Sequence, residues 1–346
     1  MTDMKSMTLA RLQEEMERQG EKKFRAKQIY SWIHEKLAES FDEMTNLPKD
    51  LKARLGQSYS LVNLTPVQVK VSKQDGTSKF LFRLSDGNVI ESVLMRYHYG
   101  NSVCISSQAG CRMGCRFCAS TLGGLERSLT PAEMLDQVYQ IQKWSKERVH
   151  NVVVMGTGEP LDNYESLLTF IEILTGEGGL RISQRNITVS TCGIAPMIRK
   201  LADEKLQITL ALSLHAATQE KRKSLMPIAN KYPLEEVMDA CRYYFEQTKR
   251  RITFEYSLVG GINDSLEDAE TLIRLVRPMN CHVNLIPVNP VKERSYVQSK
   301  RNIVMNFKNA LEKSKINVSI RREMGRDIDG ACGQLRKSFM DMEKGG

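Results

Sequence analysis

Residues 106–120 read SSQAGCRMGCRFCAS and hold three of the eight cysteines in this 346-residue chain. Cys111, Cys115 and Cys118 form a C-x3-C-x2-C pattern with no fourth cysteine close by. Structural zinc and ordinary ferredoxin clusters take four protein ligands, so three ligands leave one coordination position open. The pattern therefore predicts a metal ion or an iron–sulfur cluster that keeps one position free for a further ligand.

Apolar runs rich in Val, Ile and Leu alternate with amphipathic stretches through most of the chain after this point. The expected strands are SVCIS, NVVVMG, NITVST, ITLALSLH, RITFEYSLV and HVNLIPV, and the expected helices cover 130–147, 163–175, 195–204, 233–248, 265–277 and 299–314. Six strand–helix units predict a parallel sheet with right-handed crossovers. Near-continuous apolar strands indicate helices on one face and closure towards a barrel on the other. The predicted fold class is α/β, with a partial (β/α)6 barrel.

Two regions precede the predicted barrel. Residues 1–58 have apolar side chains at helical spacing and a break at 46–48, which predicts a small N-terminal helical domain. Residues 59–96 alternate apolar and polar side chains between turn signals, which predicts an antiparallel β extension. The barrel core is then expected over 97–321, followed by a C-terminal tail over 322–346.

Composition narrows the class of protein. Lys and Arg outnumber Asp and Glu by 50 to 41, which favours a polyanionic partner. The segment EKKFRAKQIY (21–30) would suit a nucleic-acid backbone, although a solvated helix face is the more common explanation. We expect a cytoplasmic protein without a membrane segment, because no long apolar stretch and no signal peptide occur. In a reducing cytosol, clustered cysteines indicate metal binding or catalysis, whereas Cys192, Cys241 and Cys281 are expected to be small buried apolar residues.

The residues that follow the predicted strands are the next candidates, because ligand sites of parallel α/β folds form at the carboxyl ends of strands. They are the cysteine triplet, GTGEP at 156–160, Ser190 and Thr191, Ser213 to His215, and Pro287 to Asn289. An isolated GxGEP is more often a tight turn. At a strand end, however, its glycines let a ligand approach the backbone, and Glu159 can bind an ammonium group. Ser190, Ser213 and Asn289 offer short donors and acceptors for a ribose or a carboxylate.

Taken in order, these strings resemble the RlmN/Cfr family of radical S-adenosylmethionine RNA adenine methyltransferases. The resemblance runs from about Phe24 to Leu335 and rests on SSQAGCRMGCRFCAS, MGTGEP, SLHA, SLMPIANKYP, HVNLIPVNP and IDGACGQL. It implies a radical-SAM barrel in which Cys111, Cys115 and Cys118 hold one [4Fe-4S] cluster, whose open iron is chelated by S-adenosylmethionine. The cofactor-binding residues that it implies are Gly158, Glu159, Ser190, Ser213, Leu214, His215 and Asn289.

The same resemblance implies that two further cysteines and a carboxylate carry the reaction. Adenine C2 is electron-poor, so polar transfer of an electrophilic methyl group to it is unfavourable and a radical route is expected. Cys332 would accept a methyl group from one S-adenosylmethionine, and a second would supply the radical that activates this methyl group. Cys104 would release the product through a transient disulfide with Cys332, and Glu91 would accept the ring proton. From the residues alone, Cys104 is more typical of a strand core.

The function implied by the resemblance is methylation of adenine C2 in the peptidyl-transferase region of 23S rRNA and next to the anticodon in tRNA. The implied partners are these RNAs and an electron donor such as flavodoxin or ferredoxin, and we expect a monomer. Arg321, Arg322 and Arg326 lie close to Cys332 in the sequence and either hold RNA phosphates or form a solvated rim.

Two alternatives stay open at this stage. One is a Cfr-type methyltransferase that modifies adenine C8 and confers ribosomal antibiotic resistance; Pro160 in GEPLDN fits the C2 pattern better. The other is a non-catalytic, metal-stabilised RNA-binding module, in which the three clustered cysteines and a distant fourth ligand are structural.

Overall fold

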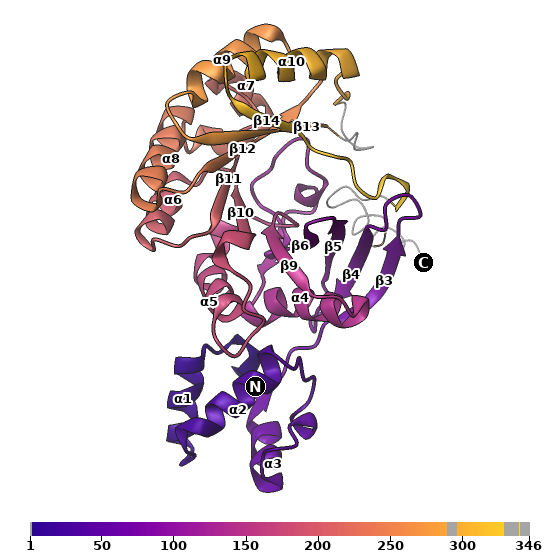
Figure 1. The fold of residues 1–346 in the computed structure, drawn as a ribbon, viewed down its shortest axis with the longest axis vertical. Helices are drawn as coiled ribbons and strands as arrows, with labels where there is room; N and C mark the ends of the chain where they lie inside the picture. Colours follow the sequence, from indigo (N-terminus) through magenta and orange to yellow (C-terminus); the bar gives the residue numbers. More distant parts are fainter. Residues whose placement is uncertain (1, 289–295, 329–338, 340–346) are drawn as a thin grey trace.

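The computed structural model describes residues 2–288, 296–328 and 339, and its centre is a ten-stranded mixed sheet (Figure 1). The parallel strands are β6 (Gly100–Ile105), β9 (Val149–Val154), β10 (Ile187–Thr191), β11 (Thr209–Ser213), β12 (Ile252–Leu258), β13 (Cys281–Pro287) and β14 (Asn317–Ile320). The antiparallel strands are β3 (Thr65–Val71), β4 (Ser78–Arg83) and β5 (Val89–Tyr97). Within the described residues, β3 and β14 are the two edges and do not pair with each other, so the barrel is partial. The predicted α/β fold class is confirmed.

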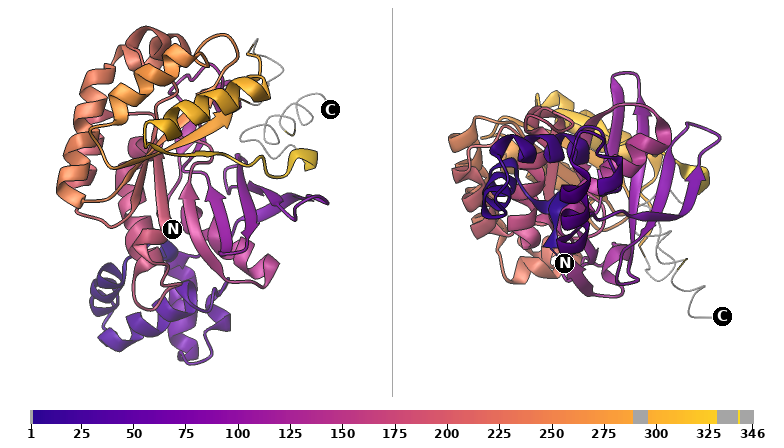
Figure 2. Two further views of the ribbon diagram at one scale, coloured as in Figure 1. Left: turned by 45° about the horizontal axis from the view of Figure 1, so that its top comes forward. Right: turned by 90° about the horizontal axis from the view of Figure 1, so that it is seen from below.

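A helix follows each of the first six parallel strands, as the sequence predicts. These helices are α4 (Pro131–Ser145), α5 (Tyr164–Thr175), α6 (Ala195–Asp203), α8 (Leu234–Thr248), α9 (Leu266–Val276) and α10 (Arg301–Lys313). They form an outer layer around the curved sheet (Figure 2). The start of α4 is fixed by a capping box between Thr130 and Glu133, with Pro131 at the first helical position. No helix in the described part of the chain has the length and apolar character needed to cross a membrane.

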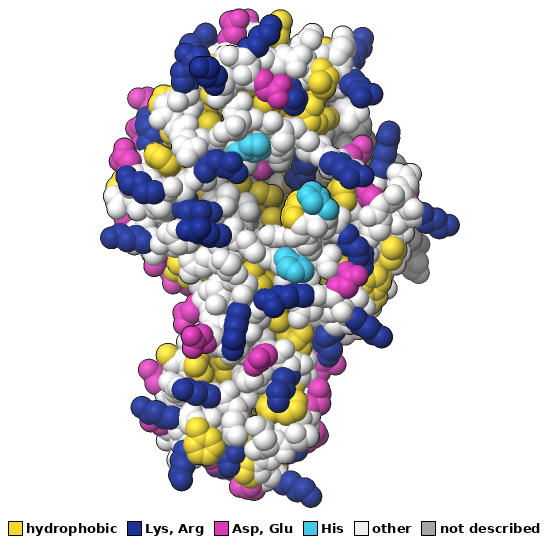
Figure 3. Space-filling view, viewed as in Figure 1, with side chains coloured by type: hydrophobic (Ala, Val, Ile, Leu, Met, Phe, Trp, Pro, Cys, Tyr) yellow, Lys and Arg dark blue, Asp and Glu magenta, His cyan; other side chains and the backbone are white. Residues whose placement is uncertain are grey.

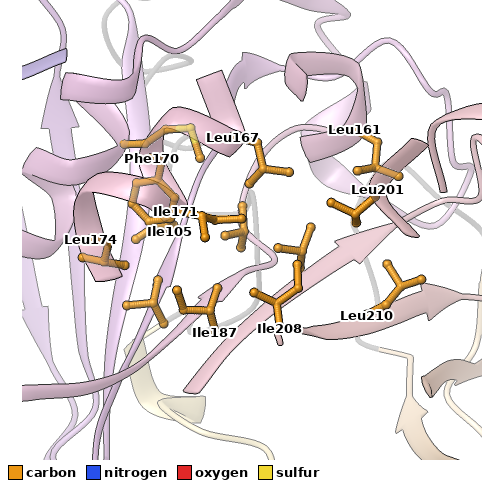
Figure 4. Close-up of a cluster of buried hydrophobic side chains, with 14 of the residues drawn as sticks. Ile105, Leu161, Leu167, Phe170, Ile171, Leu174, Ile187, Leu201, Ile208 and Leu210 are labelled. Atoms are coloured by element: carbon orange, nitrogen blue, oxygen red, sulfur yellow. The ribbon is translucent and has the colours of Figure 1, made fainter. Parts of the chain in front are cut away.

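The core lies between the sheet and this outer layer (Figure 4). Ile187 of β10, Leu210 of β11, and Leu167 and Ile171 of α5 belong to one cluster of buried hydrophobic side chains, and all four are at most 1% exposed. Burying one such side chain contributes about 1.5–3 kcal/mol relative to leaving it exposed. This packing fixes the strand ends where the predicted site residues lie.

The N-terminal residues form a helical lobe below the barrel in Figure 1. Its helices are α1 (Leu9–Arg18), α2 (Lys23–His34) and α3 (Lys49–Ser58), and two short strands, β1 (Thr2–Asp3) and β2 (Tyr59–Ser60), pair in parallel. The ammonium of Lys5 lies 2.6 Å from the carboxylate of Asp136 in α4, and both side chains are almost fully buried. Removing one partner would leave an uncompensated buried charge and would weaken the contact between lobe and barrel.

The antiparallel strands continue the sheet of the barrel. β5 pairs with β6 from Val93 opposite Cys104 to Tyr97 opposite Gly100. The sequence predicts this extension as a region of its own, because its alternating pattern differs from the apolar barrel strands. Hydrogen bonds between β5 and β6 nevertheless join the alternating antiparallel strands to the apolar barrel strands in one continuous sheet.

The segment after β14, residues 321–328, crosses from one edge of the sheet towards the other, and we call it the strap. Its Gly325 N–H donates to Asp75 at 2.9 Å, and its Asp327 accepts from the Ser72 hydroxyl at 2.6 Å and from the Lys73 N–H at 3.0 Å. These acceptors and donors belong to the turn between β3 and β4. The strap therefore spans the gap that the open sheet leaves (Figure 1).

Candidate functional site

A cavity of about 550 Å³ opens at the carboxyl ends of the parallel strands. Figure 3 shows a recess in the upper part of the molecule, with apolar side chains inside it and Lys and Arg side chains around it. The predicted residues that line the cavity are Glu91, Cys104, Cys111, Cys115, Cys118, Gly158, Glu159, Ser190, Ser213 and His215. Leu214 instead packs in the core and is fully buried. Asn289 and Cys332 lie outside the described residues.

The cysteine triplet lies in a loop between two short strands that the sequence did not predict, β7 (Gln108–Gly110) and β8 (Leu125–Ser128). Gly110 has a φ of +81°, and a Cβ there would lie 2.1 Å from the carbonyl oxygen of Gly124, so only glycine fits. The Cys111 N–H donates to that oxygen at 2.7 Å, and the hydroxyl of Thr121 donates to the carbonyls of Cys115 and Cys118 at 3.0 Å. The protein backbone thus shapes this loop.

Among the described residues, no three His, Cys, Asp or Glu side chains converge closely enough to hold one metal ion. The three thiols are the ligand type of an iron–sulfur cluster. A zinc ion needs ligands about 2.3 Å from one point, whereas a cluster binds each cysteine through a different iron. Burial raises the pKa of all three thiols, that of Cys111 to about 12. Thiolates at these positions therefore require the positive charge of a bound metal.

The glycines after β9 have a structural role. A Cβ at Gly156 would lie 2.6 Å from the carbonyl oxygen of Ile105, and one at Gly158 would lie 2.7 Å from the Cβ of Gln108. Gly158 also has a φ of +112°. The sequence predicts these glycines as room for a ligand, but their immediate neighbour is the chain segment that leads into the cysteine loop. Both glycines also line the cavity, so the predicted room for a ligand stays a prediction beside this packing against a segment about 50 positions earlier in the chain.

Glu159 is held in one orientation by two backbone groups. Its carboxylate accepts from the Leu161 N–H at 3.0 Å and from the Cys192 N–H at 2.7 Å, and the residue is 3% exposed. Burial raises the pKa of Glu159, and the hydrogen bond from Cys192 opposes that shift. The carboxylate lines the cavity in a fixed place, where a cation would stabilise its ionised form.

Polar groups at the ends of β10 and β11 form the next part of the wall. The hydroxyls of Ser190 and Ser213 lie 3.3 Å apart. His215 has a φ of +56°, and its Nδ1 accepts from the Ser257 N–H at 2.9 Å. Burial, with the nearby charge of Arg222, lowers the pKa of His215 to about 3, so the ring is neutral and carries its proton on Nε2. The site therefore gains a hydrogen-bond donor without a charge.

The opposite wall comes from β5 and β6. The carboxylate of Glu91 lies 3.3 Å from the ammonium of Lys79, and both side chains are nearly fully buried. Cys104 is also buried, and burial raises the pKa of its thiol. Cys104 thus occupies a buried strand position and also lines the cavity, and its role as the resolving cysteine stays a prediction.

Two buried groups, one in the wall and one behind it, were missed at the sequence level. Glu255 of β12 is buried, and its carboxylate accepts from the Asn284 amide at 2.9 Å. Burial raises the pKa of Glu255, and the charge of Arg321 opposes this. A single carboxylate within the apolar run RITFEYSLV was the available signal. The second group is Arg222 of α7 (Gln219–Leu225), which is fully buried behind the cavity.

The strap supplies the charged rim. Arg321, Arg322 and Arg326 all line the cavity and are exposed to solvent. The guanidinium groups of Arg321 and Arg322 lower the pKa of Tyr97, although its burial outweighs them and raises it. The rim of the cavity is therefore positively charged and partly aromatic.

Two family models match the chain. Residues 105–276 match the radical SAM superfamily, and residues 2–61 match the ribosomal RNA large subunit methyltransferase N-terminal domain. The first match contains the cysteine loop and the strand ends that form the cavity. The second coincides with the helical lobe and its pair of short strands.

Full-length relatives are similar to this chain. The probable dual-specificity RNA methyltransferase RlmN of Lachnospira eligens is 66% identical, covering 99% of this chain and 97% of its own. The protein of that name from Lachnoclostridium phytofermentans is 61% identical and covers 98% and 95%. The crystal structure of a radical SAM methyltransferase from Sphaerobacter thermophilus superposes with a TM-score of 0.92 at 43% identity, over 96% of this chain and 99% of that one.

The agreement extends over the whole chain, and the cavity contains the cysteine triplet and the strand ends typical of the superfamily. The chain therefore belongs to the RlmN family of radical SAM methyltransferases, enzymes that use a [4Fe-4S] cluster and S-adenosylmethionine.

Proposed function

We propose that this enzyme methylates C2 of adenine in 23S rRNA, within the peptidyl-transferase region, and in tRNA, next to the anticodon. The observation that carries the proposal is that one cavity contains the cysteine triplet, Glu159, Glu91 and Cys104. The parallel strands supply the groups for a cofactor. The antiparallel strands, the seam with β6 and the strap supply the groups for a nucleotide.

In this proposal Cys111, Cys115 and Cys118 hold the cluster, which when bound supplies the electron that cleaves S-adenosylmethionine. Glu159 binds the ammonium of that cofactor, because its carboxylate is fixed by two N–H donors and lines the cavity. The other cofactor-binding residues in the proposal are Gly158, Ser190, Ser213, Leu214, His215 and Asn289. In this proposal the Nε2–H of His215 and the hydroxyls of Ser190 and Ser213 donate hydrogen bonds to uncharged oxygen atoms of the cofactor.

Two S-adenosylmethionine molecules are used in each turnover. The Cys332 thiolate takes a methyl group from one by displacement, and the radical from the other removes a hydrogen atom from that methyl group. The methylene radical then adds to adenine C2; the adduct would lose its unpaired electron to the oxidised cluster and its ring proton to Glu91, which restores the aromatic ring. Cys104 attacks the Cys332 sulfur, the carbon–sulfur bond breaks with its electron pair on carbon, which takes up a proton to become the methyl group, and an S–S bond forms. Reduction of this disulfide returns both thiols.

Side chains at the rim suit an RNA partner. The rings of Tyr97 and Tyr99 stack with centroids 4.9 Å apart and planes 7° apart. Tyr97 lines the cavity, and Tyr99 is 61% exposed. An exposed ring stacks on a base irrespective of sequence, and Arg321 and Arg322 beside it attract phosphates. We infer that nucleotides next to the target adenine bind at this rim.

We also propose that the enzyme acts as a monomer in the cytoplasm, where its RNA substrates occur. Flavodoxin or ferredoxin would donate the electron to the cluster. These assignments follow from the proposed substrates and chemistry.

Nucleoside mass spectrometry tests the reaction. The protein is reconstituted anaerobically with iron and sulfide and incubated with reductant, S-adenosylmethionine and unmodified 23S rRNA or tRNA. We expect 2-methyladenosine in both RNAs. 8-Methyladenosine would establish the Cfr-type alternative instead. A protein that binds zinc and forms neither 5'-deoxyadenosine nor methylated RNA would be a non-catalytic module.

The methyl carrier has its own test. Intact-protein and peptide mass spectrometry should find an added methyl group on Cys332 in the purified protein. The Cys104→Ala variant should accumulate a covalent adduct with RNA, because the step that releases the product is blocked. Normal turnover without an adduct would remove Cys104 from the reaction.

A further inference from the structure

Arg222 is a buried cation without an anionic partner in the described residues. The residue is 0% exposed and forms no ion pair with any carboxylate there. Its Nη2 donates to the Cys192 carbonyl at 2.6 Å, whereas Nε and Nη1 have no hydrogen-bond partner. Burying an unpaired charge costs several kcal/mol, so a counter-charge is expected close by.

The environment of Arg222 indicates where that counter-charge lies. Burial lowers the pKa of Arg222, and the nearby thiols of Cys192, Cys115 and Cys241 oppose this shift. Of these, Cys115 is a proposed ligand of the cluster. The helix that carries Arg222 also contacts the cysteine loop directly, because the Arg116 N–H donates to the Leu225 carbonyl at 2.9 Å.

Arg222 does not line the cavity, so it does not contact the substrate. It is a positioning residue, and one hydrogen bond accounts for part of its role. Cys192 accepts from Arg222 through its carbonyl and donates to Glu159 through its N–H. This chain of contacts fixes the backbone beside Glu159, but it uses only one of the nitrogens of the guanidinium. The charge and the two other nitrogens need a second explanation.

We propose that Arg222 balances the negative charge of the cluster and raises its reduction potential. The inference rests on the proposed role of Cys111, Cys115 and Cys118 as cluster ligands. Three thiolates outweigh the charge of the oxidised iron–sulfur core, and reduction adds one more negative charge. A buried cation stabilises the more negative state, because no solvent screens the interaction. Arg222 thereby makes electron transfer into the cluster easier.

The test is a redox titration of the reconstituted protein followed by electron paramagnetic resonance, with wild type, Arg222→Lys and Arg222→Gln. Glutamine removes the charge and keeps a polar side chain, whereas lysine keeps the charge. We expect Arg222→Gln to lower the equilibrium constant for one-electron reduction at least about tenfold, which is about 59 mV towards more negative potential. Arg222→Lys should stay closer to wild type.

Arg112→Gln is the matched control. Arg112 adjoins the ligand Cys111, but its guanidinium is 62% exposed and paired with Asp162. Removing the charge of Arg112 should leave the reduction potential of the cluster nearly unchanged, because solvent and the Asp162 carboxylate already screen that charge.

A second measurement uses the apo protein. Since Arg222 lacks a counter-charge in the apo protein, apo Arg222→Gln should unfold at a temperature no lower than apo wild type. Loading the cluster should then raise the unfolding temperature of Arg222→Gln by less than that of wild type. Two results overturn the proposal: an unchanged potential in Arg222→Gln, or an apo Arg222→Gln protein that does not fold, which would show that the fold needs the charge. A wild-type chain that binds no cluster would instead refute the proposed function.

Discussion

The two sides of the cavity differ in how firmly their side chains are held. On the parallel side, Glu159 and His215 are buried, and each accepts from at least one backbone N–H. On the side formed by the strap and the tip of β5–β6, Arg322 and Tyr99 reach solvent. A preorganised wall suits a small cofactor that must bind in one geometry. An exposed, positively charged and aromatic rim suits a large and variable polyanion.

The largest expected effect comes from removing a proposed cluster ligand on the parallel side. Cys115→Ala should lower bound iron sharply and reduce methylation below detection, because two thiolates do not hold the cluster. Cys281→Ala is the control: this cysteine is buried but lies outside the cavity, so iron content should match wild type. Iron analysis and visible absorption check both. Full iron content in Cys115→Ala would reject the assignment of the triplet.

Glu91 tests the opposite wall. Glu91→Gln keeps the shape of the side chain but removes the base, so RNA methylation should fall about a hundredfold to ten-thousandfold. Formation of 5'-deoxyadenosine should continue, since the cofactor side is intact. The comparison is made by measuring both products in one reaction. If both fall together, Glu91 supports the cofactor and the two sides are not separate in function.

Gly158 tests how strictly the parallel side is built. Gly158→Ala places a Cβ within 2.7 Å of Gln108 at a φ of +112°, which should cost about 1–3 kcal/mol of stability and weaken S-adenosylmethionine binding. Gly123→Ala is the control, because a Cβ there meets nothing within 4 Å. Urea unfolding and cofactor titration measure the effects. Equal stability in the two variants would show that the residues around Gly158 can move to make room for a Cβ atom.

Tyr99 tests the rim. Loss of one stacked base costs about 1–3 kcal/mol, so Tyr99→Ala should weaken RNA binding roughly tenfold while S-adenosylmethionine binding is unchanged. Trp144→Ala removes another partly exposed ring, which lies on α4 away from the cavity lining, and serves as the control. Binding is measured with the same RNA for each protein. An equal loss of RNA affinity in both variants would mean that the aromatic rim does not contribute specifically to RNA binding.

Acidity is the least direct test, because it acts on folding rather than on binding or catalysis. Burial lowers the pKa of His34, in the lobe, and of His215, in the parallel wall, to about 3, compared with about 6.5 when unfolded. Between these values the unfolded chain binds protons that the folded chain does not, so each group removes stability as the pH falls from about 6.5 towards 3. The slope is at most about 1.4 kcal/mol per pH unit for each histidine. Urea unfolding of apo wild type and His34→Gln at two pH values in this range should give a shallower dependence in the variant, and parallel curves would contradict this.

Much of the fold was predictable because it depends on local patterns. Strand and helix periods are read from neighbouring residues, and the six strand–helix units appear where the sequence predicts them. β14 was missed because it is short, and the β7–β8 hairpin was missed because its strands flank the cysteine loop without an apolar run.

The candidate site was predictable to the extent that its residues occur at strand ends. Ser190, Ser213 and His215 meet in space because the ends of parallel strands share one edge of a sheet. Glu255 was missed because its strand is otherwise apolar, and Arg222 because a basic helix segment such as QEKRKSL usually faces solvent.

The cysteine spacing, the strand–helix alternation and the strings of the family are properties of the sequence, and they were enough to predict the fold class and the chemistry. Three features depended on contacts between distant residues: the continuous ladder from β5 to β6, the strap across the open barrel, and the buried charge of Arg222. Burial and hydrogen-bond satisfaction depend on what packs around a side chain, and in a sheet those neighbours are tens to hundreds of residues away in the chain. For this reason the proposed position of the radical chemistry was predictable from the spacing of three cysteines, whereas the group proposed to tune it became visible only in the folded structure.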